Sequence, residues 1–132
     1  MLSDNKIATF LKDLIGKSRK GYVHWEATPP ANQGFEADEE ATGLCYFTQF
    51  GPQRLRLTQV RYKYWRDVDD WEWSSLIALD FVDGRGRLLW RFPSSAEIRE
   101  LFEIVQFRTS GVEDAIDSFL SEQFVPNAQD DS

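Results

Sequence analysis

The segment from residue 71 to residue 92 limits the fold more than any other part of the chain. Apolar side chains alternate with polar ones on both sides of a turn sequence, Asp-Gly-Arg-Gly, at residues 83–86. The alternating apolar residues are Trp71, Trp73, Ile77, Leu79 and Phe81 before the turn and Leu88, Trp90 and Phe92 after it. Period-two alternation around a glycine-rich turn is typical of a β-hairpin. We therefore expect an antiparallel hairpin at the centre of the fold.

The size of the chain favours one folded domain, and its charge bears on the class of partner. Its 132 residues are enough for a single domain over 1–125, followed by a polar tail at 126–132. The formal net charge of −7 argues against a dedicated nucleic-acid binder, because such proteins draw their affinity from cations on phosphate. The same charge favours a basic partner if the partner is a protein.

The residues before the central hairpin predict one helix and three strands. Apolar residues at helical spacing from Ile7 to Ile15 indicate an amphipathic helix that Ser3 or Asp4 can cap and that ends at Gly16. We expect strands at residues 21–25, 43–50 and 54–64, and a long acidic loop at 27–41. Leu57 and Val60 are three residues apart, so their side chains would fall on opposite faces of a regular strand. One extra residue near 58–59, a β-bulge, would place both on the same face, and we therefore predict a bulge there.

Two helices are predicted after the hairpin. Ser94 and Glu97 have the spacing of a capping box, and Ser110 and Glu113 repeat it. An apolar stripe at helical spacing follows each box. The predicted fold class is α+β: a five-stranded antiparallel meander preceded by one helix and followed by two, with the helices on one face.

The element order and several short motifs resemble a group of small acidic bacterial proteins with no established activity. These motifs are the strand entry at residues 20–25, the turn at residues 83–86, and the helix link at residues 108–116. The similarity covers residues 3–122. It implies a bacterial origin and the same order of elements, and it transfers no catalytic residue.

The sequence offers little for catalysis or cofactor binding. His24 is the only histidine and Cys45 the only cysteine, so neither a zinc site nor an intramolecular disulfide is predicted. We expect His24 to be a structural residue in a strand and Cys45 to be a small buried residue. The acids near Asp67 and Asp70 lack the spacing of a calcium loop, so no metal is predicted. The chain is predicted to need no cofactor and to be no enzyme.

The residues proposed for partner binding are aromatic and acidic. Tryptophan beside charged residues is typical of binding hot spots, although a small sheet also uses tryptophan in its core. We assign Trp73 and Trp90 to the core and leave core and surface equally open for the other two tryptophans of this region. The partner-binding candidates are Trp65, Trp71, Asp67, Asp69, Asp70, Glu36, Asp38, Glu39 and Glu40.

A second hypothesis concerns the basic residues of the strand at 54–65. Cations interleaved with aromatic residues can follow a single-stranded nucleic acid. The candidate residues are Arg54, Arg56, Arg61 and Lys63. The alternative explanation is cross-strand pairing with Glu72 and Asp80 on the next strand, and the net charge favours it.

The favoured function is a non-enzymatic protein-binding module of the bacterial cytosol, of the immunity or adaptor type. We expect no signal peptide and no membrane-spanning run, because the N-terminal residues lack a continuous apolar core. A homodimer through the second face of the hairpin, which carries Leu76, Ala78 and Val82, is left open.

Overall fold

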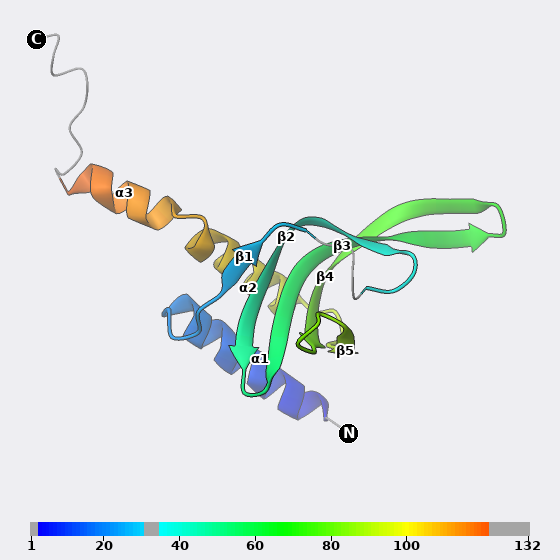
Figure 1. Cartoon of the computed structure of the whole chain (residues 1–132), viewed down its shortest axis with the longest axis horizontal. Helices are drawn as coiled ribbons and strands as arrows, with labels where there is room; N and C mark the ends of the chain where they lie inside the picture. The colour runs from blue at the N-terminus through cyan, green and yellow to red at the C-terminus, as the bar shows by residue number, and fades with distance from the viewer. Residues whose placement is uncertain (1–2, 31–34, 122–132) are drawn as a thin grey trace, which may run out of the picture.

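The computed structural model describes residues 3–30 and 35–121 and confirms the predicted α+β layout (Figure 1). One helix is followed by a five-stranded antiparallel sheet and two further helices. The elements in chain order are α1 Asp4–Arg19, β1 Glu26–Thr28, β2 Glu39–Phe50, β3 Gln53–Asp67, β4 Asp70–Val82, β5 Leu88–Arg91, α2 Ala96–Thr109 and α3 Val112–Leu120.

The strands form a simple meander in the order β1-β2-β3-β4-β5. Strands β3 and β4 pair without interruption from Arg54↔Val82 to Trp65↔Trp71, and they are far longer than their neighbours. The pairing of β2 with β3 ends at Glu39↔Tyr62, and β5 reaches β4 only at residues 80–82. The outer half of the β3–β4 hairpin therefore projects from the body as a two-stranded arm, seen at the right of Figure 1. We call residues 61–77 the arm.

The helices α1 and α2 cover one face of the sheet. Their apolar stripes pack on alternate residues of the strands, as the period-two pattern predicts. The buried residues at this interface are Leu11, Leu14, Ile15, Trp25, Tyr46, Leu55, Leu57, Leu79, Phe92, Ile98, Leu101, Phe102 and Val105. Burial of so many large side chains is the main source of stability.

The first strand and the long loop were predicted with wrong boundaries. Residues 21–25 form no strand, because they turn sharply at the end of α1 instead. Gly21 has φ +82°, and a Cβ there would lie 2.7 Å from Nη2 of Arg108, whose Nη1 donates to the carbonyl of Arg19. Trp25 is buried and donates its indole N–H to the Ser18 hydroxyl at 3.0 Å. Only residues 26–28 pair with β2, and β2 itself begins at residue 39 within the predicted loop.

The apolar phase change in β3 has a different cause from the predicted bulge. Near residues 58–59, β3 pairs with β4 in unbroken register. The irregularity lies in β2, between Ala41 and Cys45. Leu57 faces the helices, whereas Val60 is buried on the opposite face together with Arg56 and Thr58. Both faces of this strand are therefore covered, and no extra residue is needed in it.

The predicted helix boundaries are each displaced. Helix α1 continues through Gly16 to Arg19, whereas its predicted cap Ser3 does accept from the N–H of Lys6. Helix α2 is capped by Ser95, not by Ser94. Helix α3 starts after Gly111, which has φ +80° and provides no side-chain cap.

Helix α3 extends away from the sheet and has no buried residue (Figure 1). The tail predicted at residues 126–132 lies outside the described residues. None of the helices in the described ranges combines the length and apolar character needed to cross a membrane.

Candidate functional site

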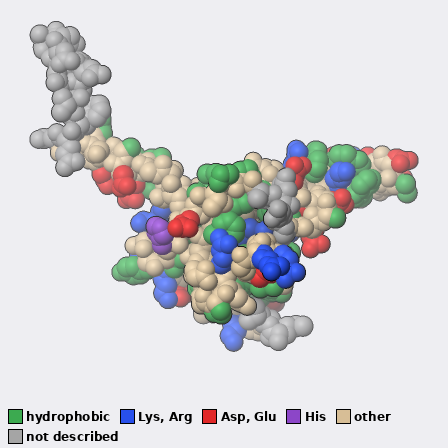
Figure 2. Space-filling view, in the orientation of Figure 1, with side chains coloured by type: hydrophobic (Ala, Val, Ile, Leu, Met, Phe, Trp, Pro, Cys, Tyr) green, Lys and Arg blue, Asp and Glu red, His purple; other side chains and the backbone are tan. Residues whose placement is uncertain are grey.

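The arm carries the main exposed aromatic surface of the described chain. The register Trp65↔Trp71 and Lys63↔Trp73 places these residues on the side of the sheet that the helices cover elsewhere. Helices α1 and α2 do not reach this far, so the indoles of Trp65, Trp71 and Trp73 are 47%, 38% and 42% exposed. Figure 2 shows hydrophobic side chains gathered along the projecting arm, with acidic ones towards its end.

The three tryptophans form a connected row. The ring centroids of Trp65 and Trp71 are 6.0 Å apart, and those of Trp71 and Trp73 are 5.3 Å apart with an interplanar angle of 84°. The Trp71–Trp73 contact is edge-to-face and the Trp65–Trp71 contact is tilted, and both orient each ring through its neighbour. We call the three tryptophans, with Arg61 and Lys63, the aromatic face.

Both cations of the aromatic face lie on indole rings. The Arg61 guanidinium is 4.1 Å from the ring centroid of Trp73 and donates two hydrogen bonds to Oε1 of Glu40, at 2.8 and 3.0 Å. The ammonium of Lys63 is 4.8 Å from the ring centroid of Trp71. Cation–π contacts of this kind hold both the rings and the charges in place.

The acidic partner-binding candidates of the arm lie at its tip. Asp67 caps the turn by accepting from the N–H of Val68, and Arg66 bridges Asp70 and Glu72 at 3.2 and 3.4 Å. Asp69 is exposed. No group of three His, Cys, Asp or Glu residues in the described ranges is arranged to hold a metal ion. The tip therefore presents carboxylates to solvent beside the aromatic face.

The four acidic candidates from the predicted loop lie in two different environments. Glu36 and Asp38 are exposed, whereas Glu39 and Glu40 belong to β2 and are half-buried. Glu39 accepts from Arg91, and Glu40 from Arg61. Among these four, only Glu40 touches the aromatic face.

The four basic candidates do not form one stripe. Arg61 and Lys63 lie on the aromatic face, but the register places Arg54 and Arg56 on the opposite side of β3. Arg54 stacks on Phe47 at 4.2 Å. Arg56 is 2% exposed and pairs with Asp80 at 2.9 Å, as the cross-strand alternative predicted. Glu72 pairs with Arg66 instead of with one of these four cations.

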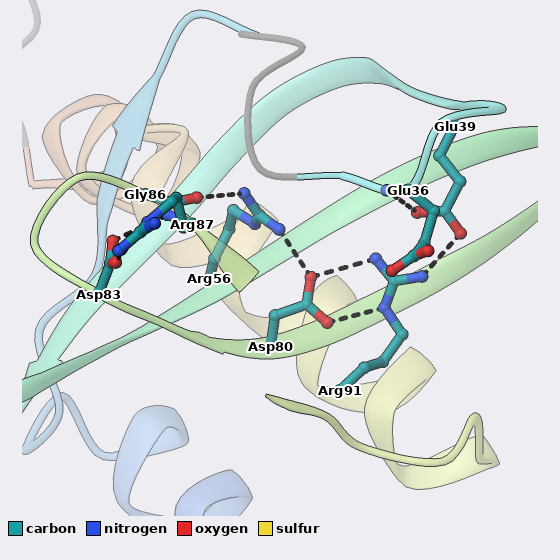
Figure 3. A network of polar contacts seen from close by, with 8 residues as sticks. All are labelled: Glu36, Glu39, Arg56, Asp80, Asp83, Gly86, Arg87 and Arg91. Atoms are coloured by element: carbon teal, nitrogen blue, oxygen red, sulfur yellow. Dashed lines mark hydrogen bonds and ion pairs between the residues drawn. The ribbon is translucent and has the colours of Figure 1, made fainter. Parts of the chain in front are cut away.

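The side chain of Arg56 belongs to a buried network of ion pairs (Figure 3). Asp80 is fully buried and accepts from Arg56 at 2.9 Å and from Arg91 at 2.8 Å, while Arg91 also donates to Glu39 at 2.8 Å. The ring of Phe35 covers the Arg56 guanidinium at 3.9 Å. The network thus joins β2, β3, β4 and β5 across the second face of the sheet, at the base of the arm.

Within this network, Arg91 has a pKa that is shifted by its surroundings. Partial burial would lower the pKa of Arg91, but its hydrogen bonds to Asp80 and Glu39 raise that pKa above the usual arginine value. Arg91 therefore stays protonated in the folded protein. Any stability linked to its raised pKa is already present below the unfolded value and is lost only in strong alkali.

The turn at residues 83–86 is held by Asp83, as the Asp-Gly-Arg-Gly pattern suggests. Its carboxylate accepts from the backbone N–H groups of Arg85 and Arg87, both at 2.9 Å, and from the Arg87 side chain. These bonds, first of all the one from the backbone of Arg87, lower the pKa of Asp83. Their contribution to the turn is present above the ordinary carboxyl pKa and is lost as the pH falls through the lowered value.

The candidates for catalysis stand apart from the aromatic face. Cys45 is buried, as predicted, on the second face of the sheet. His24 is exposed and precedes β1, so its predicted place inside a strand is wrong. It lies beside the end of α1, in a hollow that Arg108 also lines.

Sequence reasoning misassigned two tryptophans. Trp73 and Trp90 were predicted in the core, but they are 42% and 38% exposed. Trp90 lies on the short strand β5, against Phe92 at 4.7 Å between ring centroids. For Trp73, the length of β3 and β4 could have indicated its exposure. A hairpin that is longer than the strands beside it leaves part of its apolar face uncovered.

Comparison of the chain with protein-family models, curated proteins and solved structures gave no significant match. The geometry of the arm is therefore the principal evidence on function.

Proposed function

We propose that this chain is a non-enzymatic protein-binding module that uses the aromatic face of the arm as its contact surface. The observation that carries the proposal is the ordered row of Trp65, Trp71 and Trp73, each about 40–50% exposed on one face of a projecting hairpin. Tryptophan and arginine are the residue types most enriched at binding hot spots. Two side chains of the row are fixed by cation–π contacts, so little side-chain entropy remains to be lost on binding.

The charge of the arm favours a protein with exposed cations as the partner. Residues 61–77 contain three cations, Arg61, Lys63 and Arg66, and four carboxylates. The cations are engaged by indoles or by carboxylates, whereas Asp67 and Asp69 at the tip have no cation within ion-pair distance among the described residues. A basic surface opposite the tip would add attraction and speed association. A cytosolic adaptor or immunity-type role in a bacterium is the finer form of this proposal.

Truncation of the aromatic face is the direct test. The double variant Trp65→Ala, Trp73→Ala is expected to weaken capture of the partner by about 30-fold or more, since one hot-spot truncation costs about 2 kcal/mol. The measurement is affinity capture from the native host followed by quantitative mass spectrometry, and then titration of the captured partner.

The matched control is Tyr64→Ala, because Tyr64 is 52% exposed on the opposite face of the same strand. Capture by this variant is expected to equal that of the unchanged protein. If the Trp65, Trp73 variant retains the partner as well as the control does, the aromatic face is not the contact surface. Recovery of no specific partner counts against the proposal as a whole.

Binding of single-stranded nucleic acid is the second candidate, because Arg61 and Lys63 alternate with indoles on one exposed face. A fluorescent single-stranded oligonucleotide would then bind at low salt, lose affinity steeply as salt rises, and fail to bind Arg61→Ala, Lys63→Ala. Given the carboxylates of the tip, we expect no binding by fluorescence anisotropy. Salt-sensitive binding that needs both cations would favour this candidate over the first.

A further inference from the structure

The outer edge of β4 is an open hydrogen-bonding edge. The N–H of Phe92 donates to the carbonyl of Leu79 at 2.9 Å, so the polar groups of Leu79 point away from β3. Backbone groups alternate in direction along a strand, and the β3–β4 register is unbroken over this stretch. The same outward direction therefore holds for Trp71, Trp73, Ser75 and Ile77. Among the described strands, none pairs with this side of β4 before Asp80.

This edge has little of the usual protection against pairing, because its only charged residues, Asp70 and Glu72, lie at its outer end. Natural edge strands are commonly interrupted by lysine, proline or a bulge. Residues 70–79 contain no lysine, arginine, proline or glycine, and β4 shows no bulge from residue 71 to residue 81. The other strand of the arm, β3, carries Arg61, Lys63 and Arg66 instead. A two-stranded hairpin is also marginal by itself in water, whereas three or more strands are stable.

We propose that a second copy of this chain pairs with this edge, antiparallel and centred on Ser74. In this register, the outward-facing residues pair with one another: Trp71 of each copy lies opposite Ile77 of the other, and Trp73 opposite Ser75. All four outward-facing residues then take part in hydrogen bonds between the copies. Glu72 lies opposite Leu76 and Asp70 opposite Ala78, so no like charges face each other. The four strands of the two arms form one continuous sheet.

The neighbouring registers fit less well. If the pairing is moved towards Leu79, the Leu79 carbonyl must accept a hydrogen bond from the second copy, but it already accepts one from the N–H of Phe92. A shift the other way places Ile77 opposite Asp69. The centre at Ser74 is the register that uses the open edge fully and pairs apolar side chains with each other.

The surroundings of the edge suit the arm of a second copy. A hollow of about 510 Å³ lies between the edge of β4 and α2, and its lining includes Ser75, Leu76, Ile77, Ser94, Arg99 and Phe102. In the proposed register, Trp71 of the second copy lies beside Ile77, next to this hollow. The acidic tip of that copy, with Asp69, then lies opposite Leu79, beside Phe92 and the connection from β5 to α2. There Arg99 has no ion-pair partner among the described residues, so the opposite charges of tip and helix meet.

Pairing of two copies at the edge of β4 is a separate property from the proposed binding of a foreign protein by the aromatic face. The two can fail separately. A monomer could still bind a partner through its aromatic face, and a dimer could form without one.

The register makes a position-specific prediction. Ser74 would face Ser74 of the other copy as a non-hydrogen-bonded pair, with about 4.5 Å between the Cα atoms. This distance lies within the range of a disulfide. The variant Ser74→Cys is therefore expected to form an intermolecular disulfide in most molecules on mild oxidation, as seen by non-reducing electrophoresis.

The matched control is Ser75→Cys, which would face Trp73 of the other copy and should cross-link little. Ser75 is the more exposed of the two serines, so random collision would favour it instead. The unchanged protein controls for Cys45, which is 3% exposed. Light scattering should also give twice the chain mass of 15.3 kDa for the unchanged protein and a lower average mass for Arg99→Glu. A monomeric mass, or cross-linking at residue 75 equal to that at residue 74, would overturn the proposal.

Discussion

Replacement of Asp80 by alanine is expected to lower the free energy of unfolding by about 3–5 kcal/mol. Asp80 is fully buried and accepts from two arginines, Arg56 at 2.9 Å and Arg91 at 2.8 Å. Its removal leaves the Arg56 guanidinium, itself 2% exposed, without its carboxylate in the interior. The cost comes mainly from burying this guanidinium without the Asp80 carboxylate and only in part from the lost attraction. Urea unfolding followed by tryptophan fluorescence measures the change.

The control for Asp80→Ala is Glu100→Ala, which removes an ion pair of similar length at the surface. Glu100 accepts from Arg19 at 2.9 Å, but both side chains are at least half exposed. Exposed pairs contribute about 0–1 kcal/mol. A cost for Asp80→Ala no larger than that for Glu100→Ala would show that the buried network does not hold the strands together.

Replacement of Leu101 by alanine is expected to cost about 2–5 kcal/mol. Leu101 is fully buried in α2, where it packs in the core between this helix and the sheet. Truncation removes its apolar contacts and leaves a cavity that a close-packed interior fills only in part. Thermal unfolding followed by circular dichroism should show a clear fall in Tm.

Leu120→Ala removes the same atoms from an exposed site. Leu120 is 71% exposed on α3, which has no buried residue. We expect a change within about 0.5 kcal/mol. If the two leucine variants were equally destabilised, α3 would be packed in solution in a way that the structure does not show.

The arm and the buried network depend on each other. The network lies where β5 and the start of β2 end beside the hairpin, and Arg91 connects these two elements through Asp80 and Glu39. Beyond this point, β3 and β4 continue alone. A rigid base allows a two-stranded arm to hold three indoles in fixed positions. Variants of the network are therefore expected to loosen the aromatic face as well as the fold.

The fold class was predictable because it depends on local patterns. Period-two alternation predicted the strands on both sides of the turn at residues 83–86, and the stripes of α1 and α2 followed the helical period. The predicted central position of this hairpin is wrong, because β5 is a short edge strand that pairs with β4 only at residues 80–82, and β3 and β4 form the long hairpin instead. The displaced boundaries arose where tertiary contacts outweighed local preference. Residues 21–25 have β-prone side chains but form no strand, because Gly21 turns the chain and Trp25 is buried against α1. The pairing of Arg56 with Asp80 was the favoured alternative for this strand, but its burial was not predicted, because burial depends on the elements that cover the second face.

The aromatic face was predictable only in part. Trp65, Trp71, Arg61 and Lys63 were proposed from the sequence under two different hypotheses, and the structure brings them together on one face. Trp73 was assigned to the core because it alternates in phase with the buried residues of β4. Its exposure follows from the extent of α1 and α2, which a local pattern does not contain.

By itself, the sequence determined which residues form the strands around the turn at residues 83–86, which face of β4 is apolar and the order of helices and strands, because periodicity and turn chemistry act between near neighbours. The tertiary structure decided which apolar residues are covered. Strand length and helix placement leave Trp65, Trp71 and Trp73 beyond the core. It also decided that Arg56 and Asp80 meet in the interior, because a buried charge is tolerated only where a distant residue supplies its partner.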